Sequence, residues 1–459
     1  MRHFGFIALL APFALLAFGC EEDPSSSPGG FQLPEGGSGF EIPDSSTPTP
    51  DSSTPDAPAP SGVTVTVVRQ GAPQTDVRVI FHDATGAVTG DFKTDATGVV
   101  TQPVAPSMVT VLAPYFGDEL SPLTYLAVAE GDTLTVELGR AAGTESPPIG
   151  EYSVTFGQGF DTAQDYRVQA GPNCNSFGPA DGTFVVTVYP ECVGAQGVVL
   201  ASASGRDEMP LAFSFAKNLA KPMGGATITV PALPAFVAAG SLTVSAANMP
   251  LGEHAWPSTV AIVDGRAFEL GFGANDLAES PATFRVPVGF ADAHQVDVGT
   301  YSNDSSRAII KREPATVGNI TLDFATLLPT LGDTNIVADD LKRPKVTWSP
   351  SASLNGTDGG IVSLRWYGSS GFQWRFVVPP GTTEVTAPAL PGDLSIPPST
   401  EADVALDDLA FVEATFLADY KGFKSLPMPT NANLSLLSTD APLPVNGTVR
   451  TVRTVIRPD

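Results

Sequence analysis

The chain has 459 residues and an acidic, turn-rich composition, with 49 Asp and Glu against 24 Lys and Arg, and with 45 Gly and 43 Pro. Gly and Pro interrupt helices, so this composition excludes a coiled coil or a helical bundle and favours an all-β fold. The formal net charge of −25 would repel phosphate backbones, and no Lys/Arg cluster offers a local exception. A nucleic-acid partner is therefore excluded.

The N-terminus is typical of a secretory signal peptide, which we place at residues 1–19. A short positive start precedes an apolar run of 16 residues, 4–19, that ends in small residues just before Cys20. A membrane-spanning helix needs about 20 apolar residues, whereas this run is shorter and contains Pro12, so spanning is the weaker alternative.

The segment that ends at Cys20 resembles the lipobox of bacterial lipoproteins, in which the cysteine thiol receives a diacylglyceryl group and becomes the first mature residue. Ala17 stands where the lipobox usually has Leu, and Phe18 is bulky, so ordinary cleavage that leaves a free Cys20 stays open. The cysteine count favours lipidation, because Cys174 and Cys192 can pair and Cys20 would otherwise be an exposed thiol. The resemblance implies a cell-envelope protein held in the membrane by lipid on Cys20.

A tether, residues 20–61, follows the anchor. It is rich in Pro, Ser, Thr and Gly, it has no Lys or Arg, and the sequence DSSTP at 44–48 recurs at 51–55. Such a stretch buries too little apolar surface to offset its ordering entropy, so we predict a disordered spacer that holds the folded part off the membrane. O-glycosylation of the repeat is the alternative to an unmodified spacer.

The rest of the chain predicts tandem antiparallel Ig-like β-sandwich domains. Apolar residues alternate with period two, as in 63–67 and 77–82, and turn residues lie between the runs. Sandwich domains of roughly 100 residues give four units, each expected to have a separate core. We place their boundaries at 62–141, 150–235, 236–338 and 343–459.

The first unit contains a repeated turn motif. The tetrapeptide DATG at 83–86 returns at 95–98 and predicts two tight turns with a strand between them. The turn residues and core valines of this unit are Gly71, Pro73, Val77, Val79, Gly86 and residues 94–98. In their order they resemble the carboxypeptidase regulatory-like, or prealbumin-like, β-sandwich. The resemblance implies a β-sandwich fold and a protein at the cell surface. In such families this module is an accessory domain without catalytic residues.

The second unit holds two of the three cysteines. We predict a disulfide between Cys174, in a loop that contains Gly and Pro, and Cys192, at a strand end. By the loop-entropy model a ring of this size contributes about 3 kcal/mol of stability.

The sequence contains no motif typical of a catalytic or metal-binding site. The spacings of zinc proteases, nucleotide-binding loops and serine hydrolases do not occur, so we expect neither a cofactor nor an enzyme. We expect His82 to be a surface residue, because it lies on the polar face of its strand. The most distinctive histidine lies between Glu253 and Trp256, and the three residues Glu253, His254 and Trp256 form our candidate ligand loop.

Three features have competing interpretations. The tryptophans Trp348, Trp366 and Trp374 share strand faces with aliphatic residues, which favours core packing over a glycan-binding platform. The acidic pairs at 339–340 and 407–408 are interpreted as solvated acids rather than calcium ligands. Residues 400–410 are the only segment with helical character, with their acids on a solvated face.

These observations favour a cell-envelope lipoprotein that acts as a non-catalytic binding, adhesion or scaffolding surface. Its ligand would be an extracellular glycan or protein. The alternative is a carbohydrate-active enzyme or its carbohydrate-binding subunit, since paired carboxylates come together only in the fold.

Overall fold

The structure, a computed structural model, describes residues 62–454 apart from 70, 104–105, 115–119, 139–146, 180–181, 195, 206–208, 274, 302–304, 338–339, 341, 367–371, 395–403, 431–443 and 445. The described residues belong to one compact unit. Nearly all of its regular structure is strand, and its helices are short: α1 (Tyr420–Ser425) and the 3-10 turns η1 (Pro190–Cys192) and η2 (Phe324–Thr326). The all-β prediction is confirmed.

The first segment forms two facing sheets. Its strands are β1 (Val63–Arg69), β2 (Ala72–Pro73), β3 (Arg78–His82), β4 (Val88–Lys93), β5 (Val99–Gln102), β6 (Met108–Pro114), β7 (Leu120–Leu126) and β8 (Thr133–Glu137). In one sheet β1 lies between β5 and β8, and the other runs β4-β3-β6-β7. The period-two valines of β1 point into the space between the sheets, where Val63, Val65 and Val67 are fully buried.

The two DATG turns have the same local structure. Asp83 accepts hydrogen bonds from the backbone N–H groups of Thr85 (2.8 Å) and Ala87 (3.0 Å), and Asp95 accepts the corresponding pair from Thr97 and Val99. The glycine that ends each turn has a positive φ, which glycine adopts without strain. The first turn closes the β3–β4 hairpin, while the second carries the chain to the opposite sheet.

The three later segments supply the other strands. The second has β9 (Gly150–Val154), β10 (Asp165–Gly171), β11 (Cys174–Gly178), β12 (Phe184–Val188), β13 (Gly197–Ser204), β14 (Pro210–Leu219), β15 (Ala226–Thr229) and β16 (Val237–Ala238). The third has β17 (Gly240–Ala247), β18 (Ala255–Val263), β19 (Arg266–Phe272), β20 (Ala282–Val286), β21 (Ala293–Tyr301), β22 (Ser305–Pro314) and β23 (Asn319–Asp323). The last has β24 (Thr334–Val337), β25 (Lys345–Trp348), β26 (Gly359–Trp366), β27 (Gln373–Val378), β28 (Glu384–Thr386), β29 (Val404–Ala414), β30 (Met428–Pro429) and β31 (Thr448–Thr454).

One connectivity recurs along the chain. The first strand of a segment lies between an antiparallel and a parallel partner in β5-β1-β8, β12-β9-β15 and β20-β17-β23. Four strands in a corresponding order face them, β4-β3-β6-β7, β11-β10-β13-β14 and β19-β18-β21-β22, and the last segment has β27-β26-β29-β31. The sandwiches are thus repeated, and their sheets are mostly antiparallel with recurrent parallel pairs.

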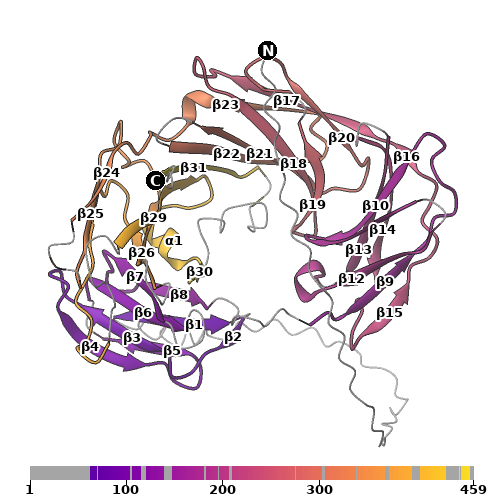
Figure 1. The fold of residues 1–459 in the computed structure, drawn as a ribbon. Coiled ribbons are helices and arrows are strands. Elements are labelled where there is room, and N and C mark those ends of the chain that lie inside the picture. The colour runs from indigo at the N-terminus through magenta and orange to yellow at the C-terminus, as the bar shows by residue number, and fades with distance from the viewer. Residues whose placement is uncertain are drawn as a thin grey trace, which may run out of the picture. The chain divides into compact units, whose positions relative to one another are not determined.

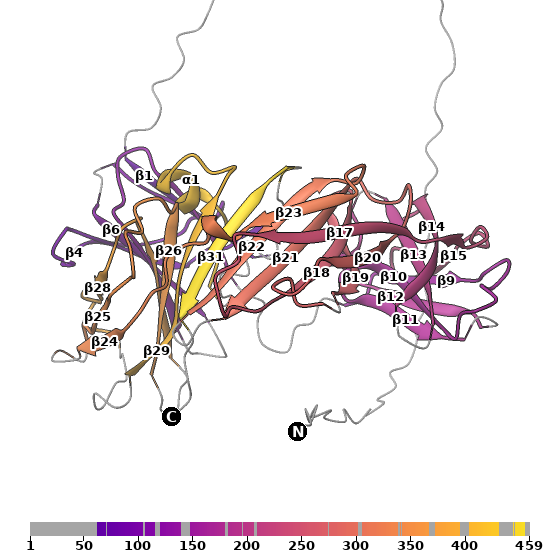
Figure 2. The same ribbon diagram turned by 90° about the horizontal axis from the view of Figure 1, so that it is seen from above.

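Three of these four-stranded sheets join edge to edge into one 12-stranded sheet. Strand β22 pairs with β31, and β27 pairs in parallel with β7, so the indigo first segment lies directly against the orange and yellow last segment (Figures 1 and 2). One hydrophobic core accordingly contains Val65 and Tyr125 of the first segment together with Ile361, Val377 and Phe423 of the last. The expectation of a separate core for each unit is therefore wrong for the first and last. The second segment has a core cluster of its own, but Val198, Leu200 and Phe213 of this segment belong to a second cluster that it shares with the third, so the expectation is wrong there too.

The helix expected at 400–410 is wrong. In the part of this segment that the structure describes, the chain forms β29, which is hydrogen-bonded to β26 on one side and to β31 on the other. The expectation that Asp408 is a solvated acid is also wrong, because its side chain is buried and ion-paired with Arg453, while Asp407 is paired with Arg365. Pairing with two neighbouring strands outweighs a weak local helix preference.

Candidate binding surface

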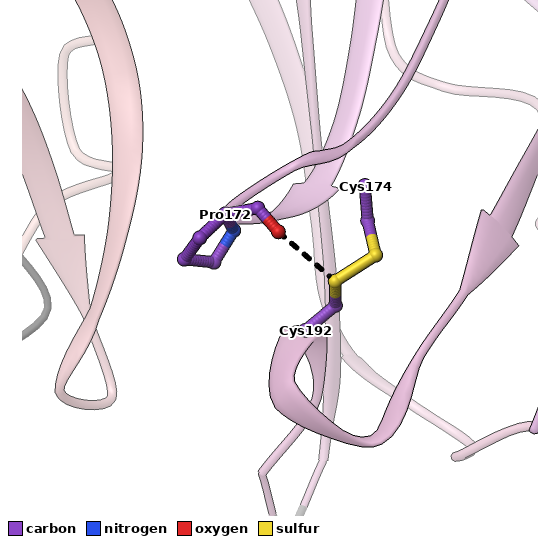
Figure 3. Close-up of a disulfide and its surroundings, with 3 residues drawn as sticks. All are labelled: Pro172, Cys174 and Cys192. Carbon is purple, nitrogen blue, oxygen red and sulfur yellow. Dashed lines mark hydrogen bonds between the residues drawn. A yellow bond between two sulfur atoms is a disulfide. The ribbon is translucent and has the colours of Figure 1, made fainter. Parts of the chain in front are cut away.

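The predicted disulfide is confirmed. Cys174 begins β11, Cys192 ends η1, and their Cα atoms are 6.2 Å apart (Figure 3). The carbonyl oxygen of Pro172 lies 3.1 Å from Cys192 Sγ, a contact rather than a donated hydrogen bond because a disulfide sulfur has no proton. A Cβ at Gly171 would lie 2.5 Å from the carbonyl oxygen of Cys192, so glycine is needed where the bridge draws the two backbones together.

Glu253, the first residue of the candidate ligand loop, has its carboxylate occupied within the protein. Its Oε1 accepts a hydrogen bond from Arg307 Nη2, and both side chains are largely buried. A ligand could reach this carboxylate only by breaking the ion pair. Glu253 therefore positions the loop and is not directed at a ligand.

His254 and Trp256 lie together at the start of β18. Their rings stack with centroids 5.9 Å apart and an interplanar angle of 19°. His254 Nδ1 is hydrogen-bonded to the carboxylate of Asp276, which also accepts from the Ala255 N–H at 3.0 Å. The histidine is thus held against the indole, while the Trp256 side chain remains 52% exposed.

Trp256 belongs to the outer face of the sheet of the third segment. Alternate residues of β18, including Ala255 and Ala261, enter the core, so Trp256, Ser258 and Val260 point outward. Gly299 of β21 lies directly across from Trp256. On the same face the Tyr301 ring leans back over Gly299, within about 4 Å of where a Cβ would be. Two exposed aromatic rings, those of Trp256 and Tyr301, therefore flank a residue without a side chain.

A pocket of about 590 Å³ continues this outer face. One wall comes from the second segment, with Asp165, Arg167 and Gln169 of β10, and the other from the third segment, with Ser258 and Glu269 of β18 and β19. Both walls therefore carry polar side chains, and apolar residues, among them Phe213, Val260 and Leu270, line the pocket between them. Sequence reasoning missed the pocket because its walls are about 100 residues apart, and no local pattern brings two sheets together.

Direct contacts connect the two walls. Arg167 Nη2 is 2.7 Å from Glu269 Oε2, and Gln169 Nε2 donates to the Glu269 carbonyl oxygen at 3.0 Å. The Arg167 guanidinium also lies 5.3 Å from the ring centroid of Phe177, which lines the pocket from β11 and is 68% exposed. One feature of the sequence does indicate this wall. The residues of β10 alternate, so that Arg167 and Gln169 lie on the strand face opposite to the one that carries the core residues Tyr166 and Val168.

Asp297 lies beside the pocket on β21, directly across from the pocket residue Ser258. Its other cross-strand neighbour is the apolar Ile310. Burial in this environment disfavours the ionised carboxylate and raises the pKa of Asp297 to about 6. This carboxyl group therefore changes charge in mildly acidic solution.

The expectation that His82 is a surface residue is wrong. Its side chain is completely buried, and its Nε2 forms a 2.9 Å hydrogen bond with Thr110 Oγ1. The alternation was assigned correctly, since His82 lies on the face opposite the core residue Phe81. That face is not open to solvent, however, because the last segment approaches it, with Arg343 Nη2 donating to the Thr85 carbonyl oxygen at 2.7 Å.

The tryptophans expected in the core are found there: Trp348, Trp366 and Trp374 are buried. Within the residues that the structure describes, no group of three or more His, Cys, Asp and Glu side chains is arranged to hold a metal ion. The same residues include no helix with the length and apolarity needed to cross a bilayer. Cys20, the signal peptide and the tether lie outside the described residues.

Comparisons with known proteins assign no family. No protein-family profile matches the chain, and no curated protein matches it. Among solved structures, the chain gives a match to Escherichia coli α2-macroglobulin in its native conformation, with 9% identity and a TM-score of 0.10. That match covers 74% of this chain and 26% of the other, so the chain spans about a quarter of its length. At this TM-score the likeness carries no argument about fold or function.

Proposed function

We propose that this protein is a cell-envelope lipoprotein, anchored through lipid on Cys20, whose folded part provides a non-catalytic binding surface. The apolar run before Cys20 and the acidic, Pro- and Ser-rich tether after it support the anchor. The observation that carries the binding role is Trp256, a large indole half exposed on a strand whose next outward residue, Ser258, lines a 590 Å³ pocket. An exposed aromatic ring beside a concavity that combines apolar and polar side chains is typical of recognition sites.

The state of the ionisable groups supports binding rather than turnover. In the pocket, Arg167 and Glu269 are paired with each other. Of the described histidines, His82 and His294 are buried, and His254 is bound to Asp276. General acid–base chemistry needs a group that is free to reach the substrate, which these partners and this burial disfavour at Arg167, Glu269 and the histidines. The carboxyl groups of Asp165 in the pocket wall and Asp297 beside it are outside this argument, so the turnover measurement below decides for them.

The anchor is tested by Cys20→Ala. A lipidated N-terminus holds the protein through two or more acyl chains, enough for stable membrane attachment. The variant should move from the membrane pellet to the soluble fraction, and the wild-type chain should stay in the pellet through a high-salt wash. Retention of Cys20→Ala in the pellet would contradict the lipoprotein assignment.

The non-catalytic role is tested by incubating the full-length protein with soluble polysaccharides and measuring new reducing ends. We expect none. Turnover that Glu269→Gln abolishes would instead show a carbohydrate-active enzyme with its site in this pocket.

A further inference from the structure

We infer that the pocket between β10 and β18/β19, together with the aromatic face around Trp256, binds a neutral oligosaccharide. This inference rests on the binding role proposed above and names the ligand class for that same surface. It follows from four properties of the surface: the hydrogen-bonding groups on its walls, its exposed rings, its extent and its charge.

The pocket walls present hydrogen-bonding groups of both kinds. The exposed carboxylates of Asp165 and Glu269 accept, the hydroxyl of Ser258 does either, and Arg167 keeps further N–H groups beside the one that it gives to Glu269. Gln169 is 3% exposed and already donates to the Glu269 carbonyl oxygen, so it shapes the wall without contacting a ligand. A sugar hydroxyl both donates and accepts hydrogen bonds, so it can pair with either the donors or the acceptors of the pocket. Because Glu269 already balances the charge of Arg167, no counter-charge is required from a ligand.

Aromatic rings stand at both sides of this polar region. Phe177 on β11 is 68% exposed and lines the pocket, and Trp256 on β18 is 52% exposed on the adjoining face. The C–H faces of a pyranose ring are apolar and flat, and they pack against aromatic rings while the equatorial hydroxyls bond at the edges. Both rings are held in place, Phe177 by Arg167 and Trp256 by His254, so little side-chain freedom would be lost on binding.

The surface is longer than a single sugar ring. Trp256, Ser258 and Val260 follow one another outward along β18, which at about 3.3 Å per residue extends roughly 13 Å from the indole into the pocket. The pocket then continues to Phe177. A chain of several linked sugars fits this path, whereas a monosaccharide would touch only one of the two rings.

Charge and strand pairing disfavour the other ligand classes. A net charge of −25 repels polyanions. A peptide bound by strand addition needs a free sheet edge, and the Trp256 face offers none because β18 is hydrogen-bonded to β19 on one side and to β21 on the other. The end strands β19 and β11 contribute Glu269 and Phe177 to the pocket, so strand addition is disfavoured at the Trp256 face alone. Only side chains are offered on the face that carries Trp256, which suits a ligand recognised through hydroxyls and ring faces.

The test uses the full-length protein in detergent micelles and a panel of neutral hexasaccharides: α- and β-linked glucose, xylose, mannose and N-acetylglucosamine oligomers. Binding is measured by calorimetry and by tryptophan fluorescence. The other three tryptophans, Trp348, Trp366 and Trp374, are buried, so a ligand at this surface should perturb the emission of Trp256. We expect at least one oligomer to bind and to change that emission.

Two variants on different strands locate the site. Trp256→Ala and Phe177→Ala should each weaken binding at least ten-fold, and Trp256→Ala should abolish the fluorescence change. The matched control is Phe92→Ala, which removes another exposed aromatic ring, 46% exposed on β4 and outside the pocket. It should bind as wild type does. If one variant fails to fold, the other still decides, because the two rings lie on separate segments.

Three outcomes would overturn the inference. They are no binding of any oligomer to the wild-type chain, binding that survives both substitutions, or binding lost equally in Phe92→Ala. A chain that stays anchored through Cys20 but binds none of the oligomers would refute the sugar ligand and leave the proposed anchored binding protein standing. Hydrolysis of the oligomers would instead refute the proposed non-catalytic role.

Discussion

Burial favours the neutral form of two ionisable side chains. Desolvation raises the pKa of Asp297 to about 6, and it lowers the pKa of His82 to about 4. The two shifts have opposite consequences for stability. An acid that binds its proton more tightly in the native state stabilises the fold as pH falls, whereas a base that loses proton affinity destabilises it.

At the residue scale we predict that Asp297→Asn stabilises the protein at neutral pH. Between pH 4 and 6 the native state of the wild type binds more protons at this position than the unfolded chain, so its stability falls as pH rises through that window. The variant should gain up to about 3 kcal/mol at pH 7 and almost nothing at pH 4. Urea unfolding of both proteins at the two pH values measures this.

His82→Gln is the control variant for that experiment, because its effect on stability should depend on pH in the opposite direction. Here the wild type loses stability as pH falls from 6.5 to 4, because the unfolded chain takes up a proton that native His82 refuses. The stability difference between wild type and His82→Gln should therefore change in the direction opposite to the Asp297 difference. An Asp297→Asn difference that is the same at pH 7 and pH 4 would contradict the pKa assigned to Asp297.

At the scale of elements, the disulfide lies in the core cluster of the second segment, which is distinct from the cluster of the first segment. The bridge spans 18 residues of sequence and joins β11 to the end of η1 inside that cluster, while Val198, Leu200 and Phe213 connect the segment to the core of the third. Closing a ring of this size contributes about 3 kcal/mol by restricting the unfolded chain. We predict that the double variant Cys174→Ser and Cys192→Ser speeds amide hydrogen exchange in β9, β10, β12 and β13.

Exchange in β1, β3, β6 and β8 of the first segment should not change in the disulfide variant, and these strands serve as the internal control. The comparison is made by mass spectrometry of peptides from the two segments. Faster exchange in these control strands would show that the second segment does not open independently of the first.

At the scale of the whole molecule, the first and last segments are one structural body. A parallel pair, β7 with β27, continues the sheet from one to the other. Behind it, hydrogen bonds pass from His82 through Thr110 and Thr124 to Trp374 Nε1, with distances of 2.9, 2.9 and 2.8 Å. Lys424 of α1 is ion-paired with Asp132 just before β8, and both side chains are almost completely buried. We therefore expect these segments to unfold together.

The corresponding prediction is that Asp132→Ala destabilises the protein by about 3–5 kcal/mol, because it leaves the ammonium of Lys424 buried without its partner. Trp374 lies in β27 of the last segment, so tryptophan fluorescence during denaturant unfolding detects whether a change in the first segment reaches it. The whole transition should shift to lower denaturant.

The control for this prediction is Glu384→Ala, which breaks a solvent-exposed ion pair with Lys345 and should cost at most about 1 kcal/mol. A fluorescence transition that Asp132→Ala leaves unshifted would show that the two segments unfold separately.

The sequence by itself determined the features that depend on near neighbours and on counting. Period-two alternation located β1, β3 and most later strands, and repeated turn residues located the hairpin at 83–86. Two cysteines remaining after one N-terminal cysteine predicted the bridge between Cys174 and Cys192. Aliphatic neighbours on the same strand face predicted that Trp366 and Trp374 are core residues. Each inference needs only the local chain or its composition.

Only the tertiary structure decided what covers each face and which strands meet. Alternation shows which residues share a strand face, but it carries no information about a sheet or loop that arrives from 100 or more residues away. For that reason His82 is buried under the last segment, residues 404–414 form a strand between β26 and β31, and Arg167 meets Glu269 across a pocket. Edge-to-edge pairing uses the backbone N–H and C=O groups that every residue except proline possesses, so side chains do not mark which edges join.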